Sequence, residues 1–374
     1  MAKVYYPITQ YHILLSQIVR KKGDAIVLDE KIFTRALIER VLESGGWDQT
    51  FVISRKKGLA EFAGRFVVKS REVKELLSVQ GREIVFFSYG YRYCVFVVNL
   101  LSKRNEVIMM EDGIAPYYMS DLREGWLKAC ESISMPYAYV FLWWANNIRT
   151  DSSFVRSLDV FNVKLLTREM RNSRACNQIE RVPDDLEKNV DRINRIFDYR
   201  EGRDTLCYDV VYFDTDFVHE EYQKTEFETI CRLFSAFEGK RVLVKLRICG
   251  SGEVGHDRLK FMERIRDFYS GKMVLDVIIY DIPWEIAYMN NRKALSDAVF
   301  VCMGLSTVMI TPNLVFAQEQ SCIICQDMFL SDYFSESDLA ETRRFVDRAN
   351  QFSTDKKIHI PKTLAEMHEI VGRH

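Results

Sequence analysis

Residues 83–113 decide the fold, and they read EIVFFSYGYRYCVFVVNLLSKRNEVIMMEDG. Two short apolar runs, 83–88 and 106–110, flank a longer apolar stretch at 91–101. These lengths are typical of two β-strands joined by a helix, because parallel strands need a long crossover between them. The second strand ends at Glu111-Asp112-Gly113. The segment therefore predicts a parallel sheet with helical crossovers.

The same alternation continues on both sides of this segment. In the first half it predicts strands at 3–7, 25–28 and 50–53, edge strands at 138–143 and 162–166, and helices at 11–20, 31–43 and 73–79. In the second half it predicts strands at 207–213, 242–246, 274–280, 298–303 and 322–325, and helices at 220–235, 257–269, 284–289, 336–351 and 362–371. Strands alternating with helices favour an α/β fold.

A charged stretch separates the two halves. Charged side chains occupy 18 of the 37 positions in residues 168–204, against 28% of the whole chain. We interpret it as a polar connector that carries one amphipathic helix. The domains predicted are residues 1–167, the connector 168–204, and residues 205–374. Two Rossmann-like domains facing across a cleft are expected, with ligands beyond the carboxyl ends of the strands.

Composition excludes several classes of protein. The chain has 52 Lys and Arg against 53 Asp and Glu, a balance that argues against a dedicated nucleic-acid-binding protein. Nine Cys, an odd number within mostly apolar surroundings, indicate buried thiols in a reducing compartment. We find no apolar run long enough to span a membrane and no signal-peptide pattern. A cytoplasmic location is expected; peripheral membrane contact through the aromatic stretch 137–144 stays open, and the sequence does not indicate an oligomeric state.

Glu111-Asp112-Gly113 is the first candidate site. Two carboxylates at the end of a strand can supply a general base, and Gly113 permits the sharp turn that presents them. An ordinary acidic turn is the alternative. The six His form no pattern typical of a metal site, and no Ser-His-Asp arrangement is visible. We therefore expect neither a metal ion nor a cofactor.

Three strand ends in the second half are candidates for binding a phosphate and its nucleoside. Lys245 and Arg247 place two cations at one strand end, and Ser306 and Thr307 follow another strand as hydroxyls at a helix start. Pro283 and Glu285 begin a helix where a carboxylate can accept hydrogen bonds from ribose. The alternatives are a solvated basic strand end, a simple N-cap and a favourable charge at the helix dipole. The usual dinucleotide and P-loop fingerprints are absent.

The order of these elements resembles that of the bacterial sialyltransferases of the lipooligosaccharide and polysialyltransferase type. The resemblance covers roughly residues 3–325. It begins with a strand running into Pro7-Ile8-Thr9-Gln10. The Asp/Glu-Asp-Gly element, a Lys-x-basic strand end, Ile-Pro-x-Glu, and a strand ending in Ser-Thr follow in that order.

The resemblance implies a GT-B fold and assigns roles to the matching residues. Asp112 would be the general base, with Glu111 and Gly113 beside it. Gln10 and Lys245 would contact substrate, and Ser306 and Thr307 would bind the CMP phosphate. Ile282, Pro283 and Glu285 would form the cytidine and ribose site.

The chain departs from that family at Arg247. The family has a His-Pro pair after its Lys, and this His assists the departing CMP. Here Arg247 stands in its place and no Pro follows. Three interpretations stay open: a fixed cation has taken over the role, the donor differs, or activity has been lost.

The resemblance thus implies an inverting, metal-independent glycosyltransferase. It would transfer sialic acid or a related nonulosonic acid from a CMP-activated donor to a bacterial surface glycan or glycolipid, in lipooligosaccharide or capsule. Another nucleotide sugar, such as CMP-Kdo or a UDP-sugar, and an inactive binding subunit are the alternatives.

Overall fold

The structure is a computed structural model, and the chain forms two compact units, residues 1–198 and 199–374. It describes residues 1–54, 71–89, 91–118, 152–179, 183–200, 206–215, 220–246, 256–279, 282–316, 318–329, 335–355 and 357–373. The division falls inside the stretch predicted as a connector.

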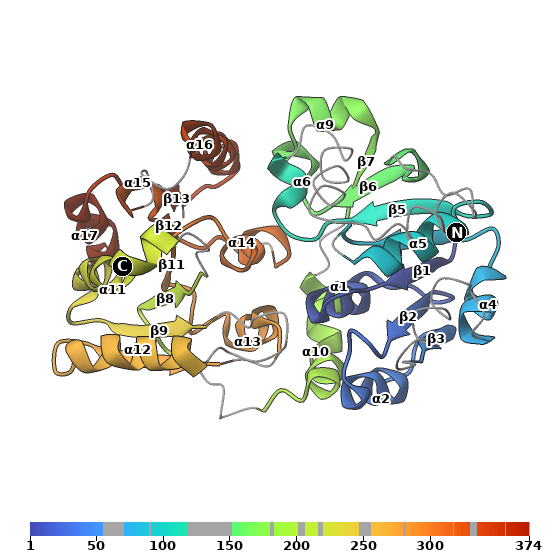
Figure 1. The fold of residues 1–374 in the computed structure, drawn as a ribbon, viewed down its shortest axis with the longest axis horizontal. Helices are drawn as coiled ribbons and strands as arrows, with labels where there is room; N and C mark the ends of the chain where they lie inside the picture. Colours follow the sequence, from blue (N-terminus) through green and yellow to red (C-terminus); the bar gives the residue numbers. More distant parts are fainter. Residues whose placement is uncertain are drawn as a thin grey trace. The chain divides into compact units, whose positions relative to one another are not determined.

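The described part of the first unit is built on a seven-stranded parallel sheet with the order β3-β2-β1-β4-β5-β6-β7 (Figure 1). Its strands are β1 (Lys3–Tyr6), β2 (Ala25–Asp29), β3 (Gln49–Ile53), β4 (Glu83–Phe86), β5 (Glu106–Met110), β6 (Ser157–Val160) and β7 (Ala175–Gln178). Its helices are α1 (Gln10–Val19), α2 (Arg35–Glu43), α4 (Arg71–Leu77), α5 (Arg92–Leu101), α6 (Ala115–Tyr118), α9 (Arg168–Ser173) and α10 (Pro183–Phe197), with 3-10 turns η1 (Ser152–Phe154) and η2 (Val163–Leu165).

Within its described segments, the second unit contains a six-stranded parallel sheet with the order β10-β9-β8-β11-β12-β13. Its strands are β8 (Val210–Phe213), β9 (Arg241–Lys245), β10 (Val274–Ile278), β11 (Val299–Cys302), β12 (Cys322–Ile324) and β13 (Ile358–His359). Its helices are α11 (Glu220–Phe234), α12 (His256–Phe268), α13 (Trp284–Asn291), α14 (Thr307–Leu314), α15 (Gln326–Phe329), α16 (Glu336–Asn350) and α17 (Leu364–Gly372), with the 3-10 turn η3 (Ser235–Phe237).

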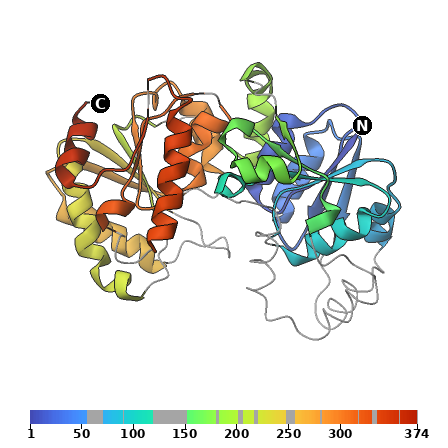
Figure 2. The same ribbon diagram turned by 90° about the horizontal axis from the view of Figure 1, so that it is seen from above.

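Each sheet is covered on both sides by helices (Figure 2). This arrangement explains the continuous apolar runs, because a strand of a parallel sheet is buried on both faces. All five residues of β2 are buried, for example. The prediction of an α/β fold with two parallel sheets is confirmed.

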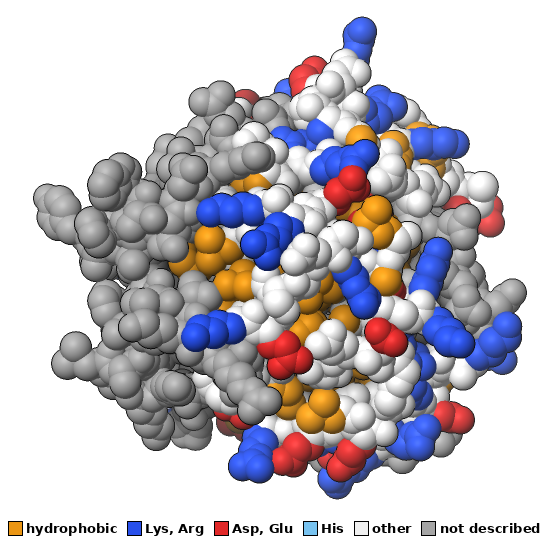
Figure 3. Space-filling view, turned by 90° about the vertical axis from the view of Figure 1, so that its right-hand side faces the viewer, with side chains coloured by type: hydrophobic (Ala, Val, Ile, Leu, Met, Phe, Trp, Pro, Cys, Tyr) orange, Lys and Arg blue, Asp and Glu red, His pale blue; other side chains and the backbone are white. Residues whose placement is uncertain are grey.

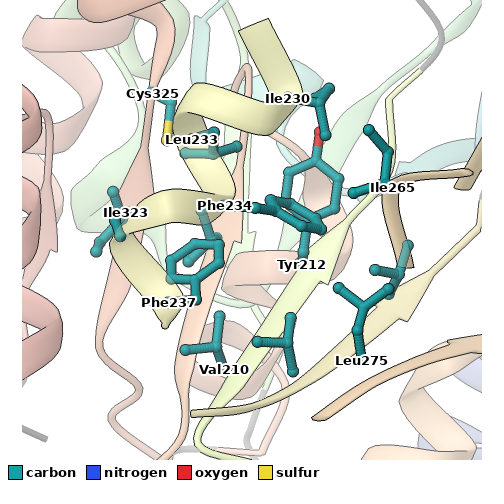
Figure 4. Packing of buried hydrophobic residues seen from close by; sticks show 14 of the residues in the cluster. Val210, Tyr212, Ile230, Leu233, Phe234, Phe237, Ile265, Leu275, Ile323 and Cys325 are labelled. Carbon is teal, nitrogen blue, oxygen red and sulfur yellow. The ribbon is translucent and has the colours of Figure 1, made fainter. Parts of the chain in front are cut away.

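The core of the second unit packs α11 and α12 against its sheet (Figure 4). Phe234 and Tyr212 meet edge to face, with ring centroids 5.1 Å apart. Met367 and Val371 of α17 join the same cluster. Since burying one such side chain contributes about 1.5–3 kcal/mol, this cluster contributes substantially to the stability of the unit.

Two segments differ from the sequence-based expectation. Residues 162–166 were expected to be an edge strand, but they contain η2, and Asn162 caps this turn by accepting a hydrogen bond from the Lys164 N–H. The strand that follows β5 in the sheet is β6, and β7, which lies within the supposed connector, forms the edge beyond it. The side chains of β7 are mostly exposed, so the strand carries no apolar run that could have revealed it. The strand predicted at 138–143 lies outside the described residues.

The surface drawn in Figure 3 mixes charges of both signs. Lys and Arg side chains alternate with Asp and Glu, and hydrophobic side chains lie between them. On this face the described residues do not form the continuous basic surface of a nucleic-acid-binding protein. Across the described part of the chain, no helix has the length and apolar character needed to cross a bilayer.

Candidate functional site

The sheet of the first unit reverses its strand order between β1 and β4. Ligands of doubly wound sheets bind at such a reversal, beyond the carboxyl ends of the strands. Three side chains follow the strands there: His12 in the first turn of α1 after β1, Phe87 directly after β4, and Asp112 after β5. All strands of the sheet are parallel, so these residues emerge at the same edge.

Asp112 is the exposed carboxylate of this edge. Its side chain is 30% exposed, whereas that of His12 is fully buried. The carboxylate oxygen Oδ1 is hydrogen-bonded to Nε2 of His12. Gly113 follows with a φ of 93°, a conformation that residues with a Cβ rarely adopt. The predicted turn is therefore present, and it leaves Asp112 accessible.

Glu111 has a different environment from its neighbour. Its side chain is fully buried, and Oε2 accepts hydrogen bonds from the hydroxyl of Tyr117 and from the backbone N–H of Phe161 at 2.8 Å. Burial and the Glu111 charge raise the pKa of Tyr117 well above its usual value, so Tyr117 stays protonated and donates. Glu111 therefore anchors β5 to the chain after β6. The sequence predicted two carboxylates presented together by the turn, but the side chain of Glu111 is buried while that of Asp112 is exposed.

The second unit gathers several predicted residues at the carboxyl edge of its own sheet. Lys245 ends β9, and Ser306 precedes α14 after β11. Ser306 occupies the N-cap position, but its side chain makes no cap hydrogen bond. A Cβ placed on the nearby Gly304 would meet nothing within 4 Å, so the backbone there borders open space. A hydroxyl and backbone N–H groups at such a helix start suit an anion.

Thr311 connects two of the predicted residues. Its hydroxyl lies 3.3 Å from Oε1 of Glu285 and 2.9 Å from the backbone carbonyl of Thr307. Glu285 is only 3% exposed. Burial raises the pKa of Glu285, while the charge of Lys245 acts in the opposite direction. The carboxyl group of Glu285 thus packs against α14 through Thr311. It is buried, whereas the predicted contact with a ribose would require it to be exposed.

Pro283 stands at the N-cap of α13, one residue before the helix begins, and its φ of −54° suits that position. Gln10 is the first residue of α1 and is half-buried. Arg247 lies outside the described residues, as does the aromatic stretch 137–144.

Asp214 directly follows β8 at this edge, and its carboxylate forms an ion pair with Arg258. Nε of Arg258 donates to Oδ2 at 2.8 Å, and Nη2 donates to Oδ1. A third nitrogen, Nη1, donates to Glu226 at 2.7 Å. In the described ranges we find no group of three or more His, Cys, Asp or Glu side chains arranged to hold a metal ion.

His12 and Thr311 were missed from the sequence. His12 precedes Asp112 by 100 residues, so no local pattern joins them. Position was an available signal, because His12 lies in the first turn of the helix after β1 and Asp112 follows β5. Thr311 lies in the interior of a mostly apolar helix, and its spacing to Glu285 carries no motif.

Comparison with known proteins supports the architecture. No protein-family model matches the chain, and no curated protein matches it. Among solved structures, it is similar to the GT-B domain of a sialyltransferase from Photobacterium damselae, with a TM-score of 0.52 and 11% identity over 96% of this chain and 100% of that one. The chain has the GT-B fold.

Two further solved structures are similar with lower TM-scores. A UDP-GlcNAc 2-epimerase from Neisseria meningitidis gives a TM-score of 0.47 at 12% identity, covering 100% of this chain and 98% of that one. A spinosyn forosaminyltransferase gives 0.45 at 13% identity, covering 100% and 95%. At such identities the similarity describes the fold, so the reaction has to be argued from the residues.

Proposed function

We propose that the protein is an inverting, metal-independent glycosyltransferase. It transfers sialic acid or a related nonulosonic acid from a CMP-activated donor to a hydroxyl of a bacterial surface glycan. The GT-B fold supports the general class, and the order of motifs along the chain supports the CMP donor.

The observation that carries the proposal is the state of Asp112. It is an exposed carboxylate at the strand-order reversal of the first sheet, and a buried imidazole holds one of its two oxygens. A general base must reach the proton it removes and must keep a defined orientation. Among the two predicted carboxylates, Asp112 meets both requirements, because Glu111 is buried.

The reaction is a single displacement. Asp112 accepts the proton of the acceptor hydroxyl. At the same time, the oxygen of that hydroxyl forms a bond to the anomeric carbon of the donor sugar. The bond from that carbon to the phosphate oxygen breaks, and its electron pair leaves with CMP. Inversion follows because the acceptor and the leaving group are on opposite faces of the sugar.

The second unit supplies the groups that stabilise the departing phosphate. Lys245, at the end of β9, and Arg247, assigned from the sequence alone, contribute positive charge. Ser306 and Thr307 contribute hydroxyl donors at the start of α14. The side chain of Ser306 makes no cap hydrogen bond, which supports this role. A serine that served only as an N-cap would accept a hydrogen bond from a backbone N–H in the first turn of the helix. Pro283 and the start of α13 are assigned to the cytidine.

Thermal shift with free nucleotides tests the donor class. A nucleotide at 100 times its Kd stabilises the unit that binds it by about 2.7 kcal/mol, which raises the Tm by about 5–10 °C for a unit of this size. We expect this shift with CMP and not with UMP or UDP. Lys245→Ala should abolish it, and the matched surface variant Lys272→Ala should keep it.

Transfer itself is measured as release of CMP from CMP-sialic acid that depends on an added glycan acceptor. If UDP alone raised the Tm, the donor would be a UDP-sugar and not a CMP-activated sugar. Transfer from CMP-Kdo alone would change the sugar and keep the mechanism. Absence of both nucleotide binding and transfer would leave an inactive binding subunit.

A further inference from the structure

The imidazole of His12 is held in one orientation. Its side chain has no exposed surface, and the ring stacks on that of Phe87 with centroids 4.3 Å apart and planes 8° apart. The backbone N–H of His12 donates to the hydroxyl oxygen of Thr9 at 3.2 Å, which fixes the first turn of α1. A ring packed in this way cannot turn to exchange its two nitrogens.

The contacts of the two ring nitrogens define the tautomer. Nδ1 lies 3.2 Å from the backbone nitrogen of Ile8. A backbone N–H can only donate, so Nδ1 must offer its lone pair. In a neutral imidazole the hydrogen is then on Nε2, which donates it to Oδ1 of Asp112.

These contacts also exclude His12 as the base. Nε2 already carries a hydrogen, and a second hydrogen on Nδ1 would point at the N–H of Ile8. Asp112 is the partner that reaches solvent, with 30% of its side chain exposed against none for His12. In this pair the exposed carboxylate faces the substrate and the buried imidazole faces the protein.

We infer that His12 is a positioning residue for the base: as a neutral imidazole it binds Oδ1 of Asp112 and leaves Oδ2 to take the acceptor proton. This inference rests on the proposed function for its catalytic consequence. The hydrogen bond between His12 and Asp112 does not depend on the proposed function. A carboxylate fixed at one oxygen loses less orientational freedom when the acceptor binds, so the benefit appears in kcat and not in nucleotide affinity.

Two variants of His12 separate positioning from simple packing. In His12→Gln the side-chain Nε2 lies near the original Nε2 and can still donate to Asp112. In His12→Asn the shorter amide can accept from Ile8 but cannot reach Asp112. Both variants lose the ring that stacks on Phe87, so each controls for the packing lost in the other.

We expect His12→Asn to lose about 10²-fold in kcat, the size of effect that a small misplacement of a catalytic group produces. His12→Gln should recover most of this loss. KM for the donor, CMP affinity and the Tm should be alike in the two variants. Equal kcat in the two variants, or wild-type kcat in His12→Asn, would overturn the positioning role.

A second measurement needs no activity. The ¹⁵N shifts of the His12 ring in the folded, full-length protein should show a protonated Nε2 and an unprotonated Nδ1. In Asp112→Ala the Nε2 hydrogen should lose its hydrogen-bonded character. An Nδ1–H tautomer or an imidazolium would overturn the inference. The expected tautomer together with no transfer by the wild type would overturn the proposed function and the catalytic consequence, while confirming the pair.

Discussion

Replacing Arg258 by Met should destabilise the second unit severely. Arg258 donates to both oxygens of Asp214 and to Glu226, and its guanidinium also lies over the ring of Phe261, 4.6 Å from the centroid. The Asp214 side chain is 2% exposed and that of Glu226 is 12% exposed. Met keeps much of the apolar stem and removes the charge, so the variant takes the Arg258 cation away from the buried Asp214 and the largely buried Glu226.

The expected loss of stability follows from the burial of these carboxylates. Removing one partner of a buried ion pair costs about 3–5 kcal/mol, because the remaining charge is no longer compensated. For a unit of 150–250 residues, each kcal/mol lowers the Tm by about 2–4 °C, so the transition of the second unit should fall by about 6–20 °C. The double variant Arg258→Met with Asp214→Leu should regain most of the loss, since it removes the buried Asp214 charge.

Urea unfolding followed by fluorescence and circular dichroism measures the effect. The control is Arg373→Met, which breaks an ion pair with Glu369 whose side chains are 67% and 66% exposed. An exposed pair within one helix is worth about 0.3–0.5 kcal/mol, so this variant should be nearly neutral. The reasoning about burial would be refuted if Arg258→Met were as stable as the control.

Three further predictions concern the second unit. Replacing Ser306 and Thr307 together by Ala should weaken CMP binding by calorimetry, since each charge-assisted hydrogen bond is worth about 1.5–3 kcal/mol; an unchanged Kd would make both residues purely structural. Transfer should persist in EDTA, because Arg258 occupies both oxygens of Asp214; loss of activity with rescue by Mn²⁺ would contradict this. Glu285→Gln should stabilise the protein increasingly as the pH rises. Burial raises the pKa of Glu285, so the wild type loses stability from the usual Glu pKa of 4.5 upward to the raised value. If the free energy of unfolding in urea differed between Glu285→Gln and the wild type by the same amount from pH 4.5 to 8, this prediction would be wrong.

The strands that could be predicted from sequence are those buried on both faces. The runs at 83–88 and 106–110 were visible because a parallel strand between two layers of helices must be apolar throughout. β7 has one neighbouring strand among the described residues and mostly exposed side chains, so its sequence resembles that of a loop. The charged composition of residues 168–204 therefore reflected an exposed sheet edge as well as a change of domain.

The candidate site shows a similar division. Glu111-Asp112-Gly113 was recognisable because the carboxylates and the glycine turn are adjacent in sequence. The sequence could not tell which of the two carboxylates is exposed. That difference depends on Tyr117 and Phe161, which fold back onto Glu111, and on His12, which comes from another strand end. Glu285 lies at a helix start as predicted, but the sequence could not show that its carboxyl group is buried and hydrogen-bonded to Thr311, 26 residues away.

The most direct test of the central claim compares transfer with nucleotide binding in Asp112→Asn. The amide oxygen can still accept from Nε2 of His12, so the side chain keeps its place and loses only its basicity. Transfer should fall by at least about 10²–10⁴-fold, with an unchanged Kd for CMP. Asp48→Asn, a control whose parent side chain is 56% exposed, should behave like the wild type. Near-wild-type transfer by Asp112→Asn would contradict the assignment of Asp112 as the base.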